Sequence, residues 1–253
     1  MKIISFHLRG KMAHFRRFYS NSSSLSYTIP PRTTITGIVA GLLGRERDDY
    51  YLDFSLDRCR IAVSSRAPIK KCMQKLNLLK VESLNDLNGS SGYHSQTATE
   101  LIIPLNIRTG IIDYQIWLHH LDGAIMNELE EILVVESPGY KSLGISLGLG
   151  TAYNLGWLEC GKVMEGEEKK ESNNQSVVSA IPTRKLHGFL IEQISAGGYR
   201  LIKEEIPLEY DHERRITERG LGNMVINLNP NPVPVKVDSY VVTDQGEIIT
   251  WME

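Results

Sequence analysis

Hydrophobic and polar residues alternate at the start of the chain. In KIISFHLRG, residues 2–10, Ile4, Phe6 and Leu8 fall on one face of an extended segment, and polar or basic side chains fall on the other. An alternation of period two predicts a half-buried β-strand. The first element is therefore expected to be a strand with one face in the core and one polar, partly basic face.

A helical pattern follows after a polar loop. The apolar positions with helical spacing are Ile35, Ile38, Val39, Leu42 and Leu43. The pair Pro30 and Pro31 favours an extended approach, Thr33 or Thr34 is placed to cap the helix, and Gly44 is placed to end it. The pattern predicts an amphipathic helix seated on a sheet.

Further strands and one more helix follow along the chain. The strand candidates are CRIAVSS (59–65), LIIPLNI (101–107) paired with IIDYQIWL (111–118) across an Arg-Thr-Gly connection, and WLECGKV (157–163). A helix capped by Asp122 has Ile125, Leu129, Ile132 and Leu133 on its buried side. The order is βαββαβ, so the expected fold class is α+β, ferredoxin-like and similar to an RNA-recognition fold.

Two polar stretches interrupt this pattern. Residues 66–100 are too long for an ordinary connection and predict a protruding hairpin or lid. Residues 166–175, GEEKKESNNQ, predict a mobile polar segment. Short strand patterns continue beyond it, and HGFLIEQI (187–194) is one of them. The expected organisation is a domain over residues 1–164, a linker over 165–176 and a small β-rich C-terminal part over 177–253.

The composition limits the class of protein. Of the 253 residues, 42% are hydrophobic and 23% are charged, values typical of a globular protein. The apolar stretches are shorter than the roughly 20 residues of a membrane helix, and the N-terminus lacks the apolar core of a signal peptide, so we expect a cytoplasmic protein with no membrane partner. Cys59, Cys72 and Cys160 lack CxxC spacing and are expected to be reduced and buried. No metal or other cofactor is predicted.

The charge is distributed unevenly along the chain. The first 45 residues hold seven Lys or Arg and no Asp or Glu, which leaves 21 basic against 30 acidic residues in the remainder. Such an uneven distribution is expected when one face of an acidic protein binds phosphate. The alternative is that solvated charges are clustered by chance. His7 and His14 in this segment are expected to contact a phosphate or to be exposed.

The glycine-rich stretch SPGYKSLGISLGLGTAYNLGW, residues 137–157, matches neither the Walker pattern nor GxGxxG. Chemistry on nucleoside triphosphates is therefore disfavoured. Glycines can bring backbone N–H groups close to an extended chain, or they can simply allow tight turns between a helix and a strand. HERR, residues 212–215, is most simply a solvated turn.

Candidate catalytic groups are few. No GxSxG elbow is present, and the cysteines have no context that suggests activation. His119 and His120 follow an apolar strand and could act as general acid or base beside Tyr114 or Lys141. Since adjacent strand residues point to opposite faces, one of the two at most can reach a given site. A surface histidine at a strand end is the simpler interpretation.

One long run carries a family resemblance. FRRFYSNSSSLSYTIPPRTTITGIVAGLLG, residues 15–44, combines paired arginines, a serine-rich loop, a Pro-Pro-x-Thr-Thr turn and a glycine-containing helix in fixed order. It resembles the N-terminal signature of the Cas-five family, the RAMP-type subunits of type I CRISPR Cascade complexes, and is closest to type I-B members. The resemblance returns at YKSLGISLGLG and WLECGKV, and more weakly at IPLEYDHERR.

The resemblance implies a fold, a function and partners. Family members have a RAMP ferredoxin-like domain with a β-hairpin thumb, here at about residues 66–107. They bind the 5′ tag of the crRNA, cap one end of the backbone filament and help to assemble the complex that recognises foreign DNA. The implied partners are the crRNA, Cas7-type backbone subunits, Cas8-type large subunits and target DNA near the foot of the complex.

The candidate RNA-binding residues follow from matched positions in three segments. They are Arg16, Arg17, Tyr27, Arg32, Thr33 and Thr34 in the signature loop, Lys70, Lys71, Tyr93 and His94 in the thumb, and Tyr140 and Lys141 beside the glycine-rich stretch. Arginine and lysine neutralise phosphates, a helix start can hold an anion, and tyrosine or histidine can stack on an unpaired base. The expected role is RNA binding without catalysis.

Two other functions compete with this reading. In type I-C systems the related subunit is a metal-independent endoribonuclease that processes precursor crRNA. Here such an activity would need Tyr27 with Lys70 or Lys71 and with His94 or His120. The other alternative is a scaffold that binds only protein through the acidic C-terminal part, which leaves the basic N-terminal segment unexplained.

Overall fold

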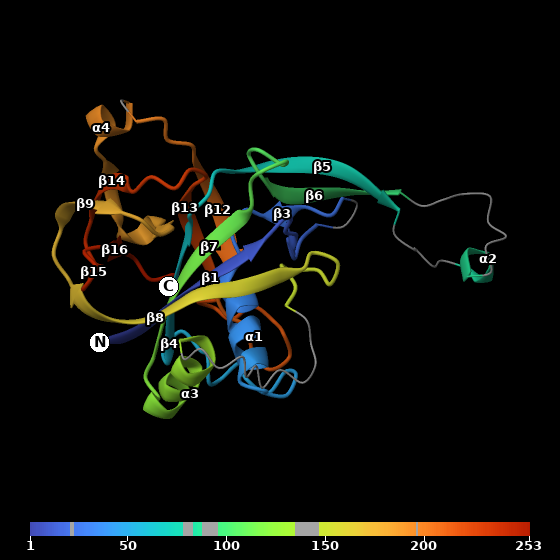
Figure 1. Ribbon diagram of the computed structural model, residues 1–253, viewed down its shortest axis with the longest axis horizontal. Coiled ribbons are helices and arrows are strands. Elements are labelled where there is room, and N and C mark those ends of the chain that lie inside the picture. The colour runs from blue at the N-terminus through green and yellow to red at the C-terminus, as the bar shows by residue number, and fades with distance from the viewer. Residues whose placement is uncertain (21–22, 78–82, 88–95, 135–146, 196) are drawn as a thin grey trace.

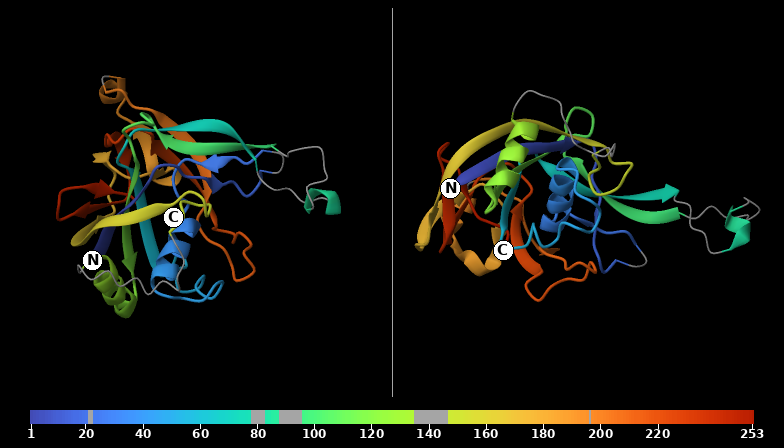
Figure 2. Two further views of the ribbon diagram at one scale, coloured as in Figure 1. Left: turned by 45° about the vertical axis from the view of Figure 1, so that its right-hand side comes forward. Right: turned by 90° about the horizontal axis from the view of Figure 1, so that it is seen from below.

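A large curled sheet organises the computed structural model, which describes all residues except 21–22, 78–82, 88–95, 135–146 and 196. Helices lie against one face of this sheet, and a long hairpin projects from the body of the molecule (Figure 1). The views from two further directions show the same projection (Figure 2). The predicted mixed α+β class is confirmed.

Four strands form the centre of the sheet. They are β1 (Lys2–Gly10), β4 (Cys59–Ser65), β7 (Ile112–His120) and β8 (Gly156–Lys169). Their order in the sheet is β8-β1-β7-β4, and each neighbouring pair is antiparallel. With α1 after β1 and α3 after β7, the chain follows the βαββαβ succession that the sequence predicts.

The main core lies between these strands and two helices. Ile4, Phe6 and Leu8 on β1 pack in one cluster with apolar residues of α1 (Arg32–Leu42) and α3 (Gly123–Leu133). Both helices therefore cover the same face of the sheet, which is the face predicted to be apolar. No helix of the described residues has the length and apolarity needed to cross a membrane.

The helix ends agree with the sequence except at one cap. Pro31 precedes α1 and no side chain caps it, so the predicted cap by Thr33 or Thr34 is wrong and both threonines lie in the first helical turn. Gly44 follows the helix with φ 66°, a left-handed conformation that glycine adopts at little cost. Asp122 caps α3 as predicted, since its carboxylate accepts the backbone N–H of Ala124 at 2.8 Å.

The projecting hairpin occupies the long polar connection between β4 and β7. It consists of β5 (Ile69–Asn77) and β6 (Gln96–Pro104), which pair with each other as a two-stranded sheet, and α2 (Leu84–Leu87) lies beyond them. We call this hairpin the thumb. LIIPLNI was predicted to pair with IIDYQIWL, which is wrong, because most of it belongs to β6 and pairs with β5.

The C-terminal strands continue the central sheet. Its full order is β11-β14-β9-β16-β15-β8-β1-β7-β4, and the added strands are β9 (Asn173–Val177), β11 (Leu186–Phe189), β14 (Val233–Val237), β15 (Tyr240–Thr243) and β16 (Ile248–Ile249). β8 joins the two parts, since it pairs with β1 over most of its length and with β15 at its end. Residues 166–169 and 173–175, predicted as a mobile linker, are strand residues here.

A second, smaller sheet completes the C-terminal part. Its strands are β10 (Ile181–Pro182), β12 (Leu201–Pro207) and β13 (Leu221–Asn227), and the short helices η1 (Thr183–Lys185) and α4 (Ile191–Ser195) lie in the connections. The sequence predicted one strand over residues 187–194. Half of this stretch is α4 instead, because its apolar residues change from strand spacing to helical spacing after Leu190.

The face of the central sheet opposite the helices is also covered. Ile3, Trp117 and Met164 form a second apolar cluster with Val241 and with the buried Trp251. These last two residues come from the C-terminal strands and the segment after them. The C-terminal part is therefore a layer of the fold that buries a face of the N-terminal strands.

The cysteines are only partly as predicted. Cys59 is buried, and burial raises the pKa of its thiol to about 12. Cys72 on the thumb is partly exposed. The side chain of Cys160 lies outside the described residues. The inert, reduced state that the sequence predicts fits Cys59 best.

Candidate nucleic-acid interface

The serine-rich loop of the signature run is held at its base. β2 (Phe15–Arg16) and β3 (Ser26–Tyr27) pair with each other, and the Ser26 hydroxyl accepts the backbone N–H of Phe15 at 3.0 Å. The loop also contacts the thumb, because Ser24 forms an isolated bridge with Thr99 on β6. The segment predicted to need an external partner is therefore ordered at its base by the protein itself.

Glu204 on β12 ties this loop to the thumb. Its Oε1 accepts Arg17 Nη2 at 2.6 Å and Lys71 Nζ at 2.7 Å, and its Oε2 accepts the backbone N–H of Thr28 at 2.8 Å. The Glu204 side chain is only 5% exposed. Arg17 and Lys71, both predicted to bind RNA, are thus engaged in a largely buried ion-pair cluster, which we call the Glu204 junction.

Arg32 has a structural role, which corrects its prediction as an RNA-binding residue. Its side chain is 1% exposed. The guanidinium donates to four backbone carbonyl oxygens, those of Leu208, Phe54, Ser55 and Cys59, at 2.6–2.9 Å. Burial lowers the pKa of Arg32. A phosphate cannot reach this group while the fold is intact, because the guanidinium is buried and its two terminal nitrogens already donate to backbone carbonyl oxygens.

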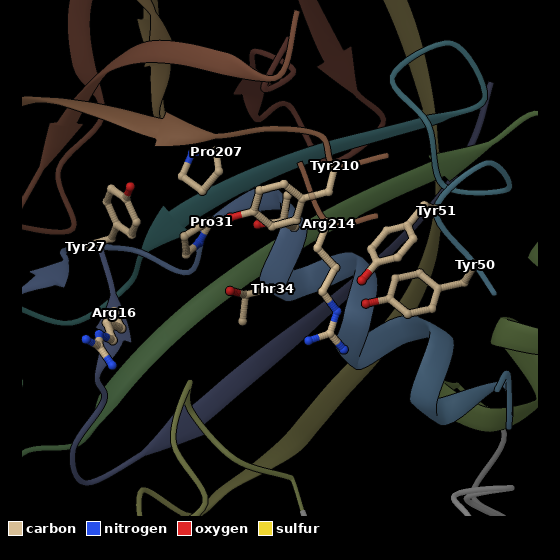
Figure 3. Close-up of a pocket in the computed structure, with 10 residues that line it drawn as sticks. Arg16, Tyr27, Pro31, Thr34, Tyr50, Tyr51, Pro207, Tyr210 and Arg214 are labelled. Atoms are coloured by element: carbon tan, nitrogen blue, oxygen red, sulfur yellow. The ribbon is translucent and has the colours of Figure 1, made fainter. Parts of the chain in front are cut away.

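A pocket of about 240 Å³ opens where the signature loop meets the start of α1. It is lined by Arg16, Tyr27, Pro31, Thr33, Thr34, Tyr50, Tyr51, Pro207, Tyr210 and Arg214. Figure 3 shows Arg214 extending towards Thr34 and the hydroxyl ends of Tyr50 and Tyr51, while Arg16 lies at the other end near Tyr27. We call this the tyrosine pocket.

The pocket combines three kinds of groups. Arg16 and Arg214 supply positive charge, and the first turn of α1, which contains no acidic residue, adds the positive end of a helix dipole. Tyr50 and Tyr51 lie with ring centroids 4.7 Å apart. Burial raises the pKa of both tyrosines, so their hydroxyls stay protonated and can donate. The arrangement suits a phosphate together with an unstacked base.

Tyr27 closes one end of the pocket. It is 1% exposed, and the guanidinium carbon of Arg17 lies 5.5 Å from its ring centroid. Its hydroxyl oxygen is buried without a hydrogen-bond partner among the described residues. Burial raises its pKa well above the usual value. The ring therefore presents a wall to the pocket and is poorly placed as a proton acceptor.

The predicted RNA-binding residues of the thumb differ in their exposure. Lys70 is half-buried, and Lys75, further along the same strand, is exposed. Tyr93 and His94, predicted to contact RNA from the thumb, lie outside the described residues. So do Tyr140 and Lys141. Of the predicted thumb cations, Lys70 remains a candidate, and Lys71 belongs to the Glu204 junction.

The histidines considered for catalysis are engaged in the fold. His120 is 2% exposed, its Nε2 lies 2.8 Å from the Asp53 carbonyl oxygen, and its Nδ1 accepts the backbone N–H of Asp122 at 2.9 Å. The prediction of a surface histidine is wrong for His120. Both ring nitrogens are used, so His120 cannot serve as a general base without unfolding of its surroundings. Burial lowers the pKa of His119, whose Nδ1 contacts the Lys2 carbonyl oxygen.

The other predicted polar groups are also bonded internally. His14 is buried, with Nδ1 2.7 Å from the Glu100 carbonyl oxygen and Nε2 2.8 Å from the Ser24 hydroxyl. His7 contacts Asp113 at 2.6 Å. The Tyr114 hydroxyl is buried and donates to the Thr28 carbonyl oxygen. The described members of the predicted nuclease set therefore do not form an accessible site.

Ion pairs neutralise three of the seven basic residues in the N-terminal segment. Lys2 pairs with Glu130, Arg9 pairs with Asp113 and Glu159, and Arg17 pairs with Glu204. The acidic partners all come from later parts of the chain. Lys11, Arg16 and Arg45 of this segment remain exposed, and Arg16 also lines the tyrosine pocket.

Gly150 in the glycine-rich stretch lies against the signature run. It has φ +89°, and a Cβ built there would lie 2.1 Å from the His14 carbonyl oxygen. The adjacent Leu149 accepts the His14 N–H at 3.0 Å. The extended chain that this glycine approaches is therefore the protein's own residues at the start of the signature run.

Replacing Gly150 by alanine is expected to lower the free energy of unfolding by about 2–3 kcal/mol, since it combines backbone strain with a backbone clash. Gly246→Ala is the matched control, because Gly246 has φ +78° and no atom within 4 Å of a built Cβ. The control is expected to lose about 1 kcal/mol. Urea denaturation measures both. Equal losses at the two positions would show that the contact with His14 is unimportant.

Sequence reasoning missed much of the pocket. Arg214 and Tyr210 lie in the weakest part of the resemblance, and HERR was taken for a solvated turn. Arg214 instead pairs with Asp48 at 2.7 and 2.9 Å and lines the pocket. Tyr50 and Tyr51 lie in a loop without helical or strand spacing. The only signal was the adjacent tyrosine pair in a polar segment.

Comparison with known families gives one match. A family model described as "CRISPR-associated protein (Cas_Cas5)" matches residues 3–102, which include β1, the signature run and most of the thumb. No curated protein matches the chain.

A solved structure shares the fold of this chain. A CRISPR protein from Archaeoglobus fulgidus has a TM-score of 0.54 and 13% sequence identity, and the alignment covers 98% of this chain and 97% of that one. A chain titled "CRISPR RNA-guided surveillance complex" aligns with a TM-score of 0.42 and 12% identity over 97% and 93% of the two chains. The fold assignment rests on the first of these. The match over residues 3–102 makes the N-terminal part of the chain similar to the CRISPR-associated Cas5 family.

Proposed function

We propose that the chain is an RNA-binding subunit of a CRISPR effector complex and that it binds the 5′ tag of the crRNA. The observation that carries this proposal is the tyrosine pocket, in which two arginines, a helix start and several tyrosine rings lie together. Single-stranded RNA is recognised by phosphate contacts combined with stacking of unpaired bases on aromatic rings. The pocket offers both kinds of contact within one site.

The proposal assigns the RNA contacts to a few accessible groups. Arg16, Thr33 and Thr34 contribute from the signature run, and Lys70 and the outer thumb contribute from residues 66–107. Arg214 and Tyr210 add contacts from the β-rich C-terminal part. Arg17, Lys71 and Tyr27 support the site from behind, because they are buried or paired.

The same proposal extends to assembly. The chain caps one end of a filament of Cas7-type backbone subunits and contacts a Cas8-type large subunit and target DNA near the foot of the complex. Support comes from the match of residues 3–102 to the Cas5 family model and from the projecting thumb, which gives the molecule a long extension beyond its body (Figure 1).

The test is direct binding of a labelled single-stranded repeat RNA by the purified full chain, at two salt concentrations. We expect salt-sensitive binding, and we expect Arg16→Ala to weaken it and to reduce the salt slope by about 0.7, the value for one lost phosphate contact. Arg184→Ala is the control, because Arg184 is exposed on η1 and lies outside the pocket.

A denaturing gel of the same samples, run with EDTA, separates binding from cleavage. Intact RNA together with the Arg16 effect supports the proposal. No binding by the wild-type chain, or equal effects of Arg16→Ala and Arg184→Ala, would refute tag binding through this pocket. A single cut in the repeat would make the protein a processing nuclease instead.

A further inference from the structure

Two strained residues meet at the wall of the tyrosine pocket. Among the residues that the structure describes, Asp48 and Arg214 are the non-glycine residues with positive φ, at 69° and 61°. They are far apart in sequence, yet they pair with each other. Residues held in this left-handed region cluster at binding sites and switch regions, so their coincidence at one contact suggests a functional constraint.

The contact itself has the geometry of an anion-binding site. Arg214 Nε donates to Asp48 Oδ1 at 2.7 Å and Nη2 donates to Oδ2 at 2.9 Å, so the carboxylate takes both arms of the guanidinium. Tyr51 Oη also donates to Asp48 Oδ1, at 2.7 Å. A phosphate presents two oxygens to an arginine in the same way as a carboxylate. Asp48 thus occupies a position that suits a phosphate.

The surroundings favour exchange of one anion for another. The Arg214 and Asp48 side chains are 48% and 38% exposed, and exposed ion pairs contribute little to stability. Arg214 lines the pocket together with Arg16 and with Thr34 in the first turn of α1. A phosphate there would gain contacts that the Asp48 carboxylate does not make.

Asp48 also has a second cation within reach. Arg47 Nε lies 3.5 Å from Asp48 Oδ2, and the Arg47 side chain is 80% exposed. A displaced carboxylate would therefore keep a positive neighbour. The charged and titratable groups around the pair include Arg47, Tyr50 and Tyr51 and also the acidic chain neighbours Asp49, Asp211 and Glu213.

We propose that Arg214 is a phosphate-binding residue of the tyrosine pocket and that Asp48 competes with the ligand for it. Binding exchanges the Asp48 carboxylate for an RNA phosphate, either a diester of the chain or a terminal monoester. Asp48 then sets the selectivity of the pocket, because a ligand must make enough other contacts to displace it. This inference rests on the proposed function of the pocket. It adds that Asp48 limits the affinity of the pocket for RNA.

The first test measures binding of a short labelled single-stranded RNA, with and without a 5′ phosphate, to full-length variants. We expect Asp48→Asn to tighten binding about fivefold, the upper range for an exposed ion pair. We expect Arg214→Ala to weaken binding roughly tenfold, as for loss of a charge-assisted contact. In the double variant the gain from Asp48→Asn should vanish, since the two residues act through one contact.

The matched control is the pair Arg219 and Asp57, which has the same two-armed geometry at 3.1 and 2.7 Å outside the pocket. Asp57→Asn is expected to leave RNA binding unchanged. An equal gain from Asp57→Asn would mean that any lost negative charge helps, which would overturn the inference. A gain from Asp48→Asn that needs the 5′ phosphate identifies the terminal group as the ligand, and a gain without it identifies a diester.

Inorganic pyrophosphate tests the exchange without RNA. Asp48→Asn should bind it about fivefold more tightly than the wild type, measured by calorimetry. If pyrophosphate shows this gain while RNA does not bind, the exchange stands and the proposed function fails. If Asp48→Asn shows no gain with either probe, the pair is only structural and the inference is wrong. Circular dichroism of each variant verifies that it is folded.

Discussion

Replacing Arg32 by methionine is expected to lower the free energy of unfolding by about 3–5 kcal/mol. The guanidinium is buried and donates to four carbonyl oxygens, which would lose these donors. Each buried acceptor left without a partner costs about 1–3 kcal/mol, less what local relaxation recovers. Urea denaturation followed by circular dichroism measures the loss.

Two variants accompany this measurement. Arg32→Lys keeps the charge but cannot reach four acceptors with one ammonium group, so we expect it to recover only part of the stability. Arg16→Met changes an exposed arginine of the same run and is expected to alter stability by less than about 0.5 kcal/mol. If Arg32→Met remains as stable as the wild type but no longer binds RNA, Arg32 contacts RNA after all.

Replacing Glu204 by alanine is the second large change. It removes the carboxylate that holds Arg17, Lys71 and the Thr28 N–H in a largely buried junction. Removing one partner of a buried ion pair typically costs about 3–5 kcal/mol, because the remaining charge is left uncompensated. We expect a loss of that size in thermal or urea unfolding.

The neighbouring Glu205 provides the control, because it lies on the same strand and is exposed. Glu205→Ala should leave stability almost unchanged. The junction also fixes the thumb against the signature loop, so Glu204→Ala should increase hydrogen exchange at residues 69–77 relative to Glu205→Ala. Identical exchange in the two variants would show that other contacts hold the thumb.

Elements specified by neighbouring residues could be predicted from the sequence. The strand at residues 2–10 and the ends of the two helices at Gly44 and Asp122 depend on side chains a few positions apart, and the structure contains them. The succession of the central strands and helices along the chain was also predicted, but the pairing of LIIPLNI with IIDYQIWL was wrong. Local periodicity was sufficient because each of these elements has one clearly apolar face.

The roles of the basic side chains could not be predicted in this way. Arg32 lies in a run whose residue types suggest RNA contact, yet its acceptors include Leu208, which is 176 positions away. Arg17 and Lys71 likewise meet Glu204 at separations of 187 and 133 residues. The uneven charge distribution along the chain is therefore reduced in the folded protein, because acidic residues from later parts of the chain pair with basic residues of the N-terminal segment.

The apolar face around Trp117 has a consequence for synthesis of the chain. That face is covered by Val241, Ile249 and Trp251, which lie more than 120 positions after Trp117 in the chain. At translation rates of about 5–20 residues per second, this interval is on the order of ten seconds. During that time a nascent chain carries an uncovered tryptophan-containing sheet face. The last strands of the chain therefore bury a sheet face that the earlier strands leave uncovered until synthesis is nearly complete.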